Sequence, residues 1–420
     1  MTKILKKPEI LCPGGTLEKL KIAIRYGADA CYIAGTDFGL RTRAGNFDEA
    51  DMKEAVAFAH AHNAKVYVVA NMVTHEGNEE GAASFFRQIE AVGVDAVLIS
   101  DPALMAICHE TTPELPIHLS TQASAVNYET LNFWAHEGLE RVVLGREASL
   151  AEIKRMKEKT TIEIECFMHG AMCIGYSGRC ALSSYMARRD ANRGGCAQPC
   201  RWLYDLMAMD EDGTMTTIGP DQALETEIPF SMSAVDLTMI EHIPDLVEAG
   251  VDSLKIEGRM KSIHYVSTVA NVYRIAIDAY CEDPQNYELK QDWVDELWKV
   301  AQRELATGFF YQKPGAHEQL YDSVRRPPKD TFIGQVLNYD HATGIATIQQ
   351  RNKFAVGDEI EFYGPGMRHA IQTVKWMENE MGERIQDCPH ALMTIKIPVE
   401  FPVERYDLIR QAHVIEKVRA

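Results

Sequence analysis

The chain has 420 residues, with 43 Lys and Arg against 61 Asp and Glu, so its formal net charge is −18. Its 46% hydrophobic and 25% charged residues are typical of a globular protein, which excludes a disordered tail, a collagen-like chain and a basic nucleic-acid coat. This length predicts about two domains. The N-terminus lacks the apolar core of a signal peptide and no apolar run is long enough to span a membrane, so we expect a cytoplasmic protein.

A phrase of glycine, one further residue and an acid precedes an apolar run at four places, beginning at Gly27, Gly93, Gly138 and Gly250. Glycine in the left-handed conformation ends a helix, and the apolar run that follows is typical of a strand buried on both faces. Helical periodicity precedes three of these phrases, in residues 17–26, 83–92 and 128–137. Further strands are predicted at residues 9–12, 65–71, 117–122 and 161–167.

Eight buried strands that alternate with helices predict a (β/α)8 TIM-like barrel, in which the reactive groups lie where the strands end. A doubly wound sheet is the alternative. It has little support, because the first strand ends in Cys12-Pro13-Gly14-Gly15-Thr16 and lacks the G-x-G-x-x-G spacing of a dinucleotide site.

Polar side chains follow the predicted strands and would form a cation-rich mouth. We assign His169 and Glu257 to catalysis, although a structural role suits His169 better. Residues assigned to substrate binding at this mouth are Gln122, Arg146, Lys255 and Arg259. A guanidinium such as that of Arg146 or Arg259 would bind a carboxylate or phosphate bidentately. For each residue the alternative is a purely structural hydrogen bond or ion pair.

The barrel pattern is interrupted at about residues 170–229, which predicts an insertion after the seventh strand, with a hairpin within residues 203–217. A helix from Phe230 to near Gly250 is expected to resume the barrel. The first domain would span residues 1–328, and residues 329–420 would form a small closed β-barrel. Its predicted strands are residues 332–339, 345–350, 359–363, 393–397 and 406–410.

Four cysteines gather in the insertion, at Cys173, Cys180, Cys196 and Cys200, separated by six, fifteen and three residues. Four thiolates suit a 4Fe-4S cluster or a tetrahedral zinc ion. Structural zinc sites usually show paired C-x2-C motifs, so the spacing favours iron and sulfur. Zinc, or cysteines that bind no metal, are the alternatives. The remaining cysteines are scattered along the chain and are typical of small buried apolar residues.

The insertion is basic in an acidic chain. Residues 141–204 hold eleven Lys and Arg and six Asp and Glu, a local charge of +5. Arg189 and Arg193 lie beside the cysteines and are assigned to substrate binding. Such positive charge can offset a negatively charged cluster or bind an anionic substrate or phosphate backbone. Both explanations are open.

Residues 165–183, ECFMHGAMCIGYSGRCALS, resemble the signature of the collagenase-like peptidase family U-32, in which Glu, Phe, Gly, Cys, Gly, Cys and Ser occur at these spacings. Residues 192–201, NRGGCAQPCR, are similar to the same family. So are residues 40–47, LRTRAGNF, and residues 255–262, KIEGRMKS. The region from about Phe332 is similar to the small β-barrel of one branch of the family.

The resemblance implies that Cys173, Cys180, Cys196 and Cys200 hold a 4Fe-4S cluster. It also implies oxygen-independent hydroxylation of RNA bases or quinone precursors. The branch with this length and C-terminal barrel forms 5-hydroxyuridine at the wobble position of tRNA, with prephenate as hydroxyl donor, which makes tRNA and a paralogous protein the expected partners. Prephenate is a dicarboxylate, which would give Arg146 and Arg259 a role.

Two other functions compete with hydroxylation. A peptidase would need an oriented nucleophile or a metal-bound water, and the chain has neither a G-x-S-x-G nor an H-E-x-x-H motif. A cysteine protease would need a thiol that holds no cluster. The third function is a non-catalytic scaffold that binds RNA or a cluster for another enzyme.

Overall fold

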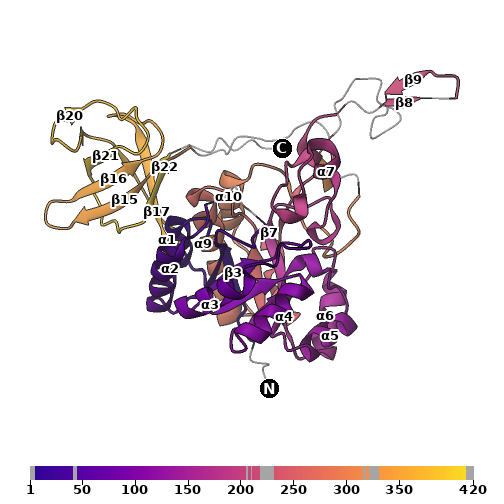
Figure 1. Ribbon diagram of the computed structural model, residues 1–420. Helices are drawn as coiled ribbons and strands as arrows, with labels where there is room; N and C mark the ends of the chain where they lie inside the picture. The colour runs from indigo at the N-terminus through magenta and orange to yellow at the C-terminus, as the bar shows by residue number, and fades with distance from the viewer. Residues whose placement is uncertain are drawn as a thin grey trace.

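The computed structural model of the protein describes residues 5–40, 45–204, 207–209, 211–217, 231–315, 318–320 and 331–412. Its first part is a closed barrel of eight parallel strands, in which β12 pairs with both β1 and β7 (Figure 1). The barrel strands are β1 (Glu9–Pro13), β2 (Ala30–Ile33), β3 (Lys65–Ala70), β4 (Ala96–Ile99), β5 (Ile117–Leu119), β6 (Arg141–Val143), β7 (Glu163–Gly170) and β12 (Ser253–Ile256). The predicted TIM-like barrel is confirmed.

Helices cover the outside of the barrel and alternate with its strands. They are α1 (Leu17–Arg25), α2 (Glu49–Ala61), α3 (Ala82–Val92), α4 (Pro102–Thr111), α5 (Tyr128–His136), α6 (Leu150–Lys159), α8 (Ile243–Glu248), α9 (Ile263–Glu282) and α10 (Gln291–Val300). The four glycines of the repeated phrase all have positive φ, between 75° and 109°, as a left-handed helix stop requires. Among the described residues, no helix is long and apolar enough to cross a membrane.

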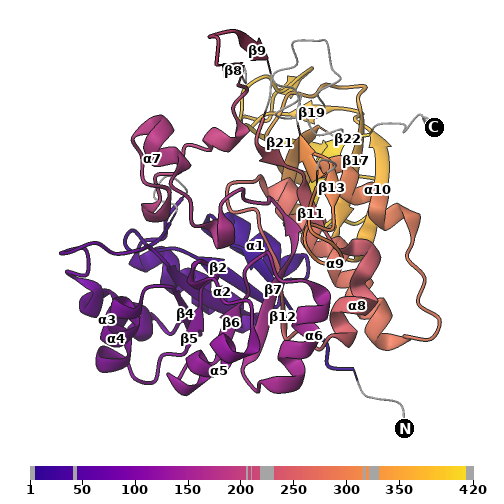
Figure 2. The ribbon, with the colours of Figure 1, turned by 90° about the vertical axis from the view of Figure 1, so that its right-hand side faces the viewer.

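The insertion follows β7, as predicted. It contains the short helices η2 (Tyr176–Gly178), α7 (Leu182–Ala187), η3 (Ala191–Arg193) and η4 (Pro199–Arg201), and then a hairpin of β8 (Met207–Met209) and β9 (Met215–Thr217). Figure 2 shows these short helices standing beyond one end of the barrel.

The helix expected from Phe230 is wrong over most of its length. Phe230 itself and residues 218–229 lie outside the described residues, and the chain then forms β10 (Ser233–Ala234), β11 (Asp236–Thr238) and η5 (Ile240–His242) before α8 begins. β11 pairs antiparallel with the end of β7, and β13 (Leu305–Ala306) pairs with β11. Pro244 lies in the first turn of α8. N–H groups in the first turn have no partner within the helix, so proline is favoured at this position and marks the start of the helix.

The C-terminal part is an eight-stranded antiparallel sheet around a separate apolar core. The two strands at the edges of this sheet do not pair with each other among the described residues, so the sheet is open where a closed barrel was expected. Its strands are β15 (Phe332–Asp340), β16 (Ile345–Gln350), β17 (Glu359–Gly364), β18 (Arg368–Thr373), β19 (Met377–Glu378), β20 (Arg384–Ile385), β21 (Thr394–Pro398) and β22 (Leu408–Gln411). All five predicted strands are present. The predicted domain boundary at residue 328 lies outside the described residues.

The C-terminal sheet packs against the barrel through buried polar contacts. Arg410 of β22 is fully buried and binds Glu296 of α10, while its Nε donates to Glu361 at 2.7 Å. The hydroxyl of Tyr26 donates to the carbonyl oxygen of Tyr363 at 2.9 Å. The bonds to Glu296 and from Tyr26 join the sheet to α10 and to the end of α1, while the bond to Glu361 lies within the sheet.

Candidate functional site

A cavity of about 250 Å³ lies between the ends of the barrel strands and the insertion. Its walls combine strand-end residues with residues of η2, α7 and η4, which are far apart in the sequence. Six polar residues at or just after the ends of barrel strands line it, namely Asn71 and the predicted Gln122, Arg146, Lys255, Glu257 and Arg259. The expected cation-rich mouth is therefore present as one surface.

All four cysteines of the insertion line the same cavity. Cys173 and Cys196 are exposed, while Cys180 and Cys200 are half-buried. Burial raises the pKa of the Cys200 thiol to about 11; Arg201 opposes this shift, and the negative charges of the other three thiolates add to it.

Backbone N–H groups point at two of these sulfurs. Leu182 donates to Sγ of Cys180 and Gln198 donates to Sγ of Cys196, each at 3.4 Å. Hydrogen bonds of this kind stabilise charge on a thiolate and tune the potential of a cluster that it holds.

Side chains outside the cysteine motif hold this loop in place. The amide of Asn192 accepts from the backbone N–H of Cys180 at 3.1 Å and donates to its carbonyl oxygen at 3.2 Å. The carboxylate of Glu147, just after β6, accepts from the backbone N–H and the hydroxyl of Ser177 at 2.6 and 3.1 Å. Gln122 Nε2 donates to the carbonyl oxygen of Gly178 at 3.3 Å.

Four cysteines are the residue type that holds a 4Fe-4S cluster, so the chemistry of the donors fits such a group, although the four side chains are not arranged around a metal position in this structure. Within the described residues, no group of three or more His, Cys, Asp or Glu side chains is placed to hold a single metal ion. Cys12, Cys31, Cys108, Cys166 and Cys388 are buried elsewhere, and Cys281 is half-buried.

The two predicted arginines of the cavity wall, Arg146 and Arg259, have different surroundings. The Arg146 guanidinium stacks on the Phe167 ring, 3.7 Å from its centroid, and its Nη2 lies 3.6 Å from Oε2 of Glu257. Arg259 is buried, and its Nη2 donates to Oδ1 of Asn46 at 2.9 Å. Glu257 is half-buried and is the one carboxylate among the described lining residues.

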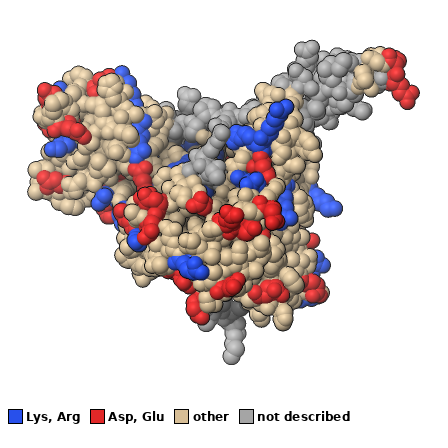
Figure 3. Space-filling view, in the orientation of Figure 1, with Lys and Arg blue, Asp and Glu red and all other residues tan. Residues whose placement is uncertain are grey.

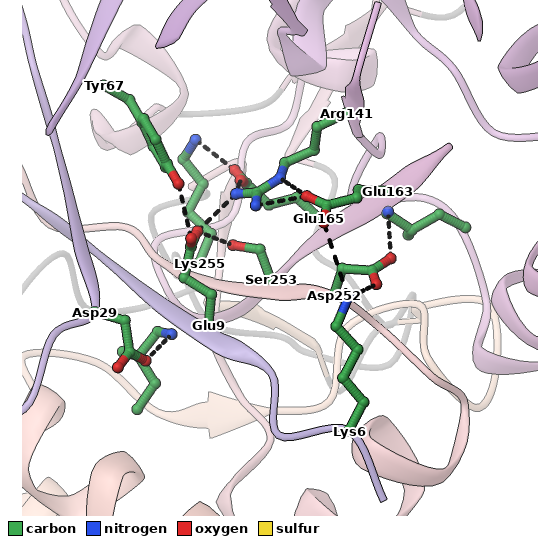
Figure 4. Close-up of polar contacts among 12 residues, drawn as sticks. Lys6, Glu9, Asp29, Tyr67, Arg141, Glu163, Glu165, Asp252, Ser253 and Lys255 are labelled. Atoms are coloured by element: carbon green, nitrogen blue, oxygen red, sulfur yellow. Dashed lines mark hydrogen bonds and ion pairs between the residues drawn. The ribbon is translucent and has the colours of Figure 1, made fainter. Parts of the chain in front are cut away.

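Lys255 connects the cavity to an ion network inside the barrel, shown in Figure 4. Its Nζ lies 2.8 Å from Oε1 of Glu165, whose Oε2 lies 3.3 Å from Arg141. Arg141 also binds Glu9 at 2.6 Å and Glu163 at 2.7 Å. Burial alone would lower the pKa of Arg141, but the carboxylates of Glu165 and Glu9 raise it, so the guanidinium remains charged.

The sequence did not predict this ion network, nor that it holds Lys255 at the cavity wall. The available signal was a charged residue inside each of several apolar strands, such as Glu165 in β7 and Arg141 at the start of β6. Which charges meet depends on the barrel register, because Glu165 is placed beside both Val143 of β6 and Ser253 of β12.

His169, expected to be catalytic or structural, is 2% exposed and is not among the described lining residues of the cavity. Its Nδ1 lies 3.3 Å from the hydroxyl of Tyr273, and its ring packs against Tyr265. Burial lowers the pKa of His169 to about 4. These contacts favour the structural role.

We expect the buried His169 to make the protein less stable as the pH falls from about 6.5 towards 4. In that window the unfolded chain takes up a proton on this histidine and the folded chain does not, which costs about 1.4 kcal/mol per pH unit. His169→Gln should therefore show a shallower loss of unfolding free energy between about pH 6 and 5 in urea titrations. The exposed control His109→Gln should keep the wild-type slope, and equal slopes in all three proteins would contradict the expectation.

Arg189 and Arg193 lie on the insertion and are not among the described residues that line the cavity. Arg189 Nη2 donates to the carbonyl oxygen of Cys196 at 3.5 Å, and Arg193 is half-buried in η3. The two arginines can therefore contact a substrate only where it extends beyond the cavity, onto the surface around it.

Known proteins resemble the chain over almost its whole length. Residues 15–320 match the family described as Peptidase family U32, and residues 328–410 match the Peptidase family U32 C-terminal domain. The tRNA hydroxylation protein P1 of Bacillus subtilis is 46% identical over 408 residues, 97% of this chain and 96% of that protein.

Two further relatives show the range of names in the family. The tRNA hydroxylation protein P2 of Bacillus subtilis is 32% identical over 74% of this chain and 99% of its own length. A protein named collagenase from Porphyromonas gingivalis is 31% identical over 95% of this chain and 96% of its own length. The chain belongs to peptidase family U32, whose members include proteins named for tRNA hydroxylation as well as for proteolysis.

Proposed function

We propose that the protein hydroxylates C5 of the wobble uridine of tRNA to 5-hydroxyuridine without molecular oxygen, using a 4Fe-4S cluster and prephenate as hydroxyl donor. The observation that carries the proposal is one cavity in which four cysteines and a group of cations meet at the barrel mouth. The relatives named for tRNA hydroxylation supply the class of reaction.

Cys173, Cys180, Cys196 and Cys200 would hold the cluster, which supplies electron transfer when it is bound. Support comes from the shared cavity and from the N–H groups that donate to Cys180 and Cys196. Asn192 and Glu147 would keep the loop in a conformation ready to bind the cluster.

The cations of the cavity suit a dicarboxylate such as prephenate. Arg146 reaches the cavity from the end of β6, and Lys255 and Arg259 reach it from the end of β12, so two carboxylates can each find a cation. Arg146 lies 3.6 Å from Glu257, which is longer than a hydrogen bond, so a ligand carboxylate can compete for its N–H groups. Gln122 would add a neutral hydrogen-bonding group on the same wall.

The proposed reaction exchanges a hydrogen for a hydroxyl group. The C5–H bond of uridine and the C–OH bond of the donor break, and a C5–OH bond and a donor C–H bond form. Uridine loses two electrons and the donor gains them, so no further oxidant enters the balance. Glu257, as the carboxylate of the cavity wall, is the proposed base for the C5 proton.

Peptidase activity is less well supported. A cysteine protease needs a thiol beside an oriented histidine. Among the described residues that line the cavity there is no histidine, although four cysteines are there.

The test uses protein purified without air, prephenate and unmodified tRNA with a wobble uridine, and it measures 5-hydroxyuridine by mass spectrometry of the digested tRNA. We expect product only when prephenate is present, and Arg146→Ala should lower the yield at limiting prephenate by about tenfold or more. Arg155→Ala, an exposed arginine on α6, is the control. No product with a fully loaded cluster would overturn the proposal, and product only after adding a paralogous protein would make this chain an accessory.

A further inference from the structure

The insertion exposes an unusual number of large apolar side chains. Among the described residues, thirteen such side chains are strongly exposed, and six of them fall within residues 174–203. Three are aromatic: Tyr185 is 85% exposed, Tyr176 is 57% and Trp202 is 41%. Ile174, Met186 and Leu203 complete the set, which we call the insertion face. So many large apolar side chains exposed to water within one short segment indicate a surface that a partner covers.

Three arginines of the insertion have no acidic partner among the described residues, whereas several arginines of the barrel and of the C-terminal sheet do. Within the described part of the chain, Arg179, Arg188 and Arg193 form no ion pair. By contrast, Arg141 and Arg274 bind two or more carboxylates each. Figure 3 shows blue side chains gathered near α7, while red side chains spread over the barrel below. In a chain of net charge −18, this local excess of positive charge favours an anionic partner.

The insertion face continues directly into the cavity. Ile174 is half-exposed and also lines the cavity, and Arg201 of η4 lines it from the same side as Cys200. Helix α7, which carries Tyr185, packs against η4, which ends just before Trp202. Ser183 of α7 also accepts from the backbone N–H of Ala197, in the loop before η4, at 2.9 Å. A strand of nucleic acid on this face would therefore lead to the cavity.

We propose that the insertion face docks the single-stranded anticodon loop, with Tyr176, Tyr185 and Trp202 stacking on bases and Arg179, Arg188 and Arg193 binding phosphates. Exposed aromatic rings interleaved with arginines suit unpaired bases, whose faces are open, better than a duplex, whose bases are stacked. The inference rests on the proposed function for its RNA partner. It adds which surface of the protein binds the RNA and how that surface recognises the loop.

The test measures binding of an anticodon stem-loop RNA by the full protein across a range of salt concentrations. Tyr185→Ala should weaken binding about tenfold, and Tyr185→Phe, which keeps the ring, should stay within about twofold. Arg188→Ala should weaken binding and lower the slope of log affinity against log salt by about 0.7, the value for one phosphate contact on a single strand.

Matched controls lie on the barrel. Phe133 on α5 is 55% exposed and Arg155 on α6 is exposed, so Phe133→Ala and Arg155→Ala should bind as the wild type does. The same stem closed as a continuous duplex should bind more weakly than the loop. Unchanged loop affinity in Tyr185→Ala would overturn the inference, as would a wild-type protein that does not bind the loop. A protein partner lost in Tyr185→Ala with RNA affinity intact would assign the face to that partner instead.

This experiment separates the inference from the proposed function, because binding is measured without turnover. Loop binding that depends on Tyr185 in a protein that forms no 5-hydroxyuridine would leave the inference standing and overturn the chemistry. Normal hydroxylation together with unchanged loop affinity in Tyr185→Ala would overturn the inference and leave the proposed function standing.

Discussion

Cys180→Ser is expected to remove the cluster and to lower 5-hydroxyuridine formation by more than about 100-fold, since even outer partners of a metal ligand are worth 10–100-fold. Serine oxygen is a poor ligand for iron, which prefers soft sulfur in such a site. The amide of Asn192 binds both backbone groups of Cys180, so the loop has little freedom to bring another sulfur into place. The nearby Cys166 is 3% exposed on β7 and belongs to the barrel core.

The measurement is iron and acid-labile sulfide per chain after purification without air, together with the visible absorption spectrum. Wild-type protein should contain about four of each. Cys281→Ser is the matched control, because Cys281 is half-buried on α9 and should leave both values unchanged. A Cys180→Ser protein with full iron and the wild-type spectrum would show that this residue is not a ligand.

Glu165→Ala is expected to lower the free energy of unfolding of the barrel by about 3–5 kcal/mol. The Glu165 side chain is fully buried between Lys255 and Arg141, which are 6% and 5% exposed. Without its carboxylate, two buried cations lose the negative charge that lies between them. Removing one partner of a buried ion network lowers the free energy of unfolding strongly, because it leaves the other charges unpaired in the interior. Replacing all partners by well-packed apolar residues costs far less.

Glu163→Ala is the control for this loss. Glu163 lies two residues earlier on β7 and binds the same Arg141 at 2.7 Å, but its side chain is 42% exposed. Exposed ion pairs contribute about 0–1 kcal/mol, so this variant should unfold close to the wild type in urea. Equal losses in the two variants would contradict the account of the network.

Glu165→Ala should also affect the cavity, because Glu165 is a positioning residue for Lys255. A lysine released from Glu165 would no longer be held at the cavity wall, so the apparent KM for prephenate should rise more than kcat falls. Glu165→Gln, which keeps the shape and one hydrogen bond, should restore part of the stability. Equal changes in KM for Glu163→Ala would show that the effect is not specific to Lys255.

Some strands of the C-terminal sheet can be predicted from the sequence, and others cannot. Strands β16 and β17 alternate apolar and polar residues around their own core, so their pattern predicts them closely. Strand β18, RHAIQT, pairs along its whole length with β17 but is mostly exposed at an edge of the sheet. An edge strand buries little, and its sequence therefore carries little of the apolar alternation that marks a strand.

The sequence by itself determined the barrel, the place of the insertion and the gathering of four cysteines in it, because buried strands, helix stops and closely spaced cysteines are local patterns of residue type. The barrel pattern also placed Gln122, Arg146, Lys255, Glu257 and Arg259 at one mouth, but only the tertiary structure decided that the four cysteines line the same cavity. It alone showed that Asn192 holds Cys180 and that Glu165 joins Lys255 to Arg141. Such contacts depend on strand register and on how the insertion folds over the barrel. Neither of these produces a repeating pattern of residue types from which it could be predicted.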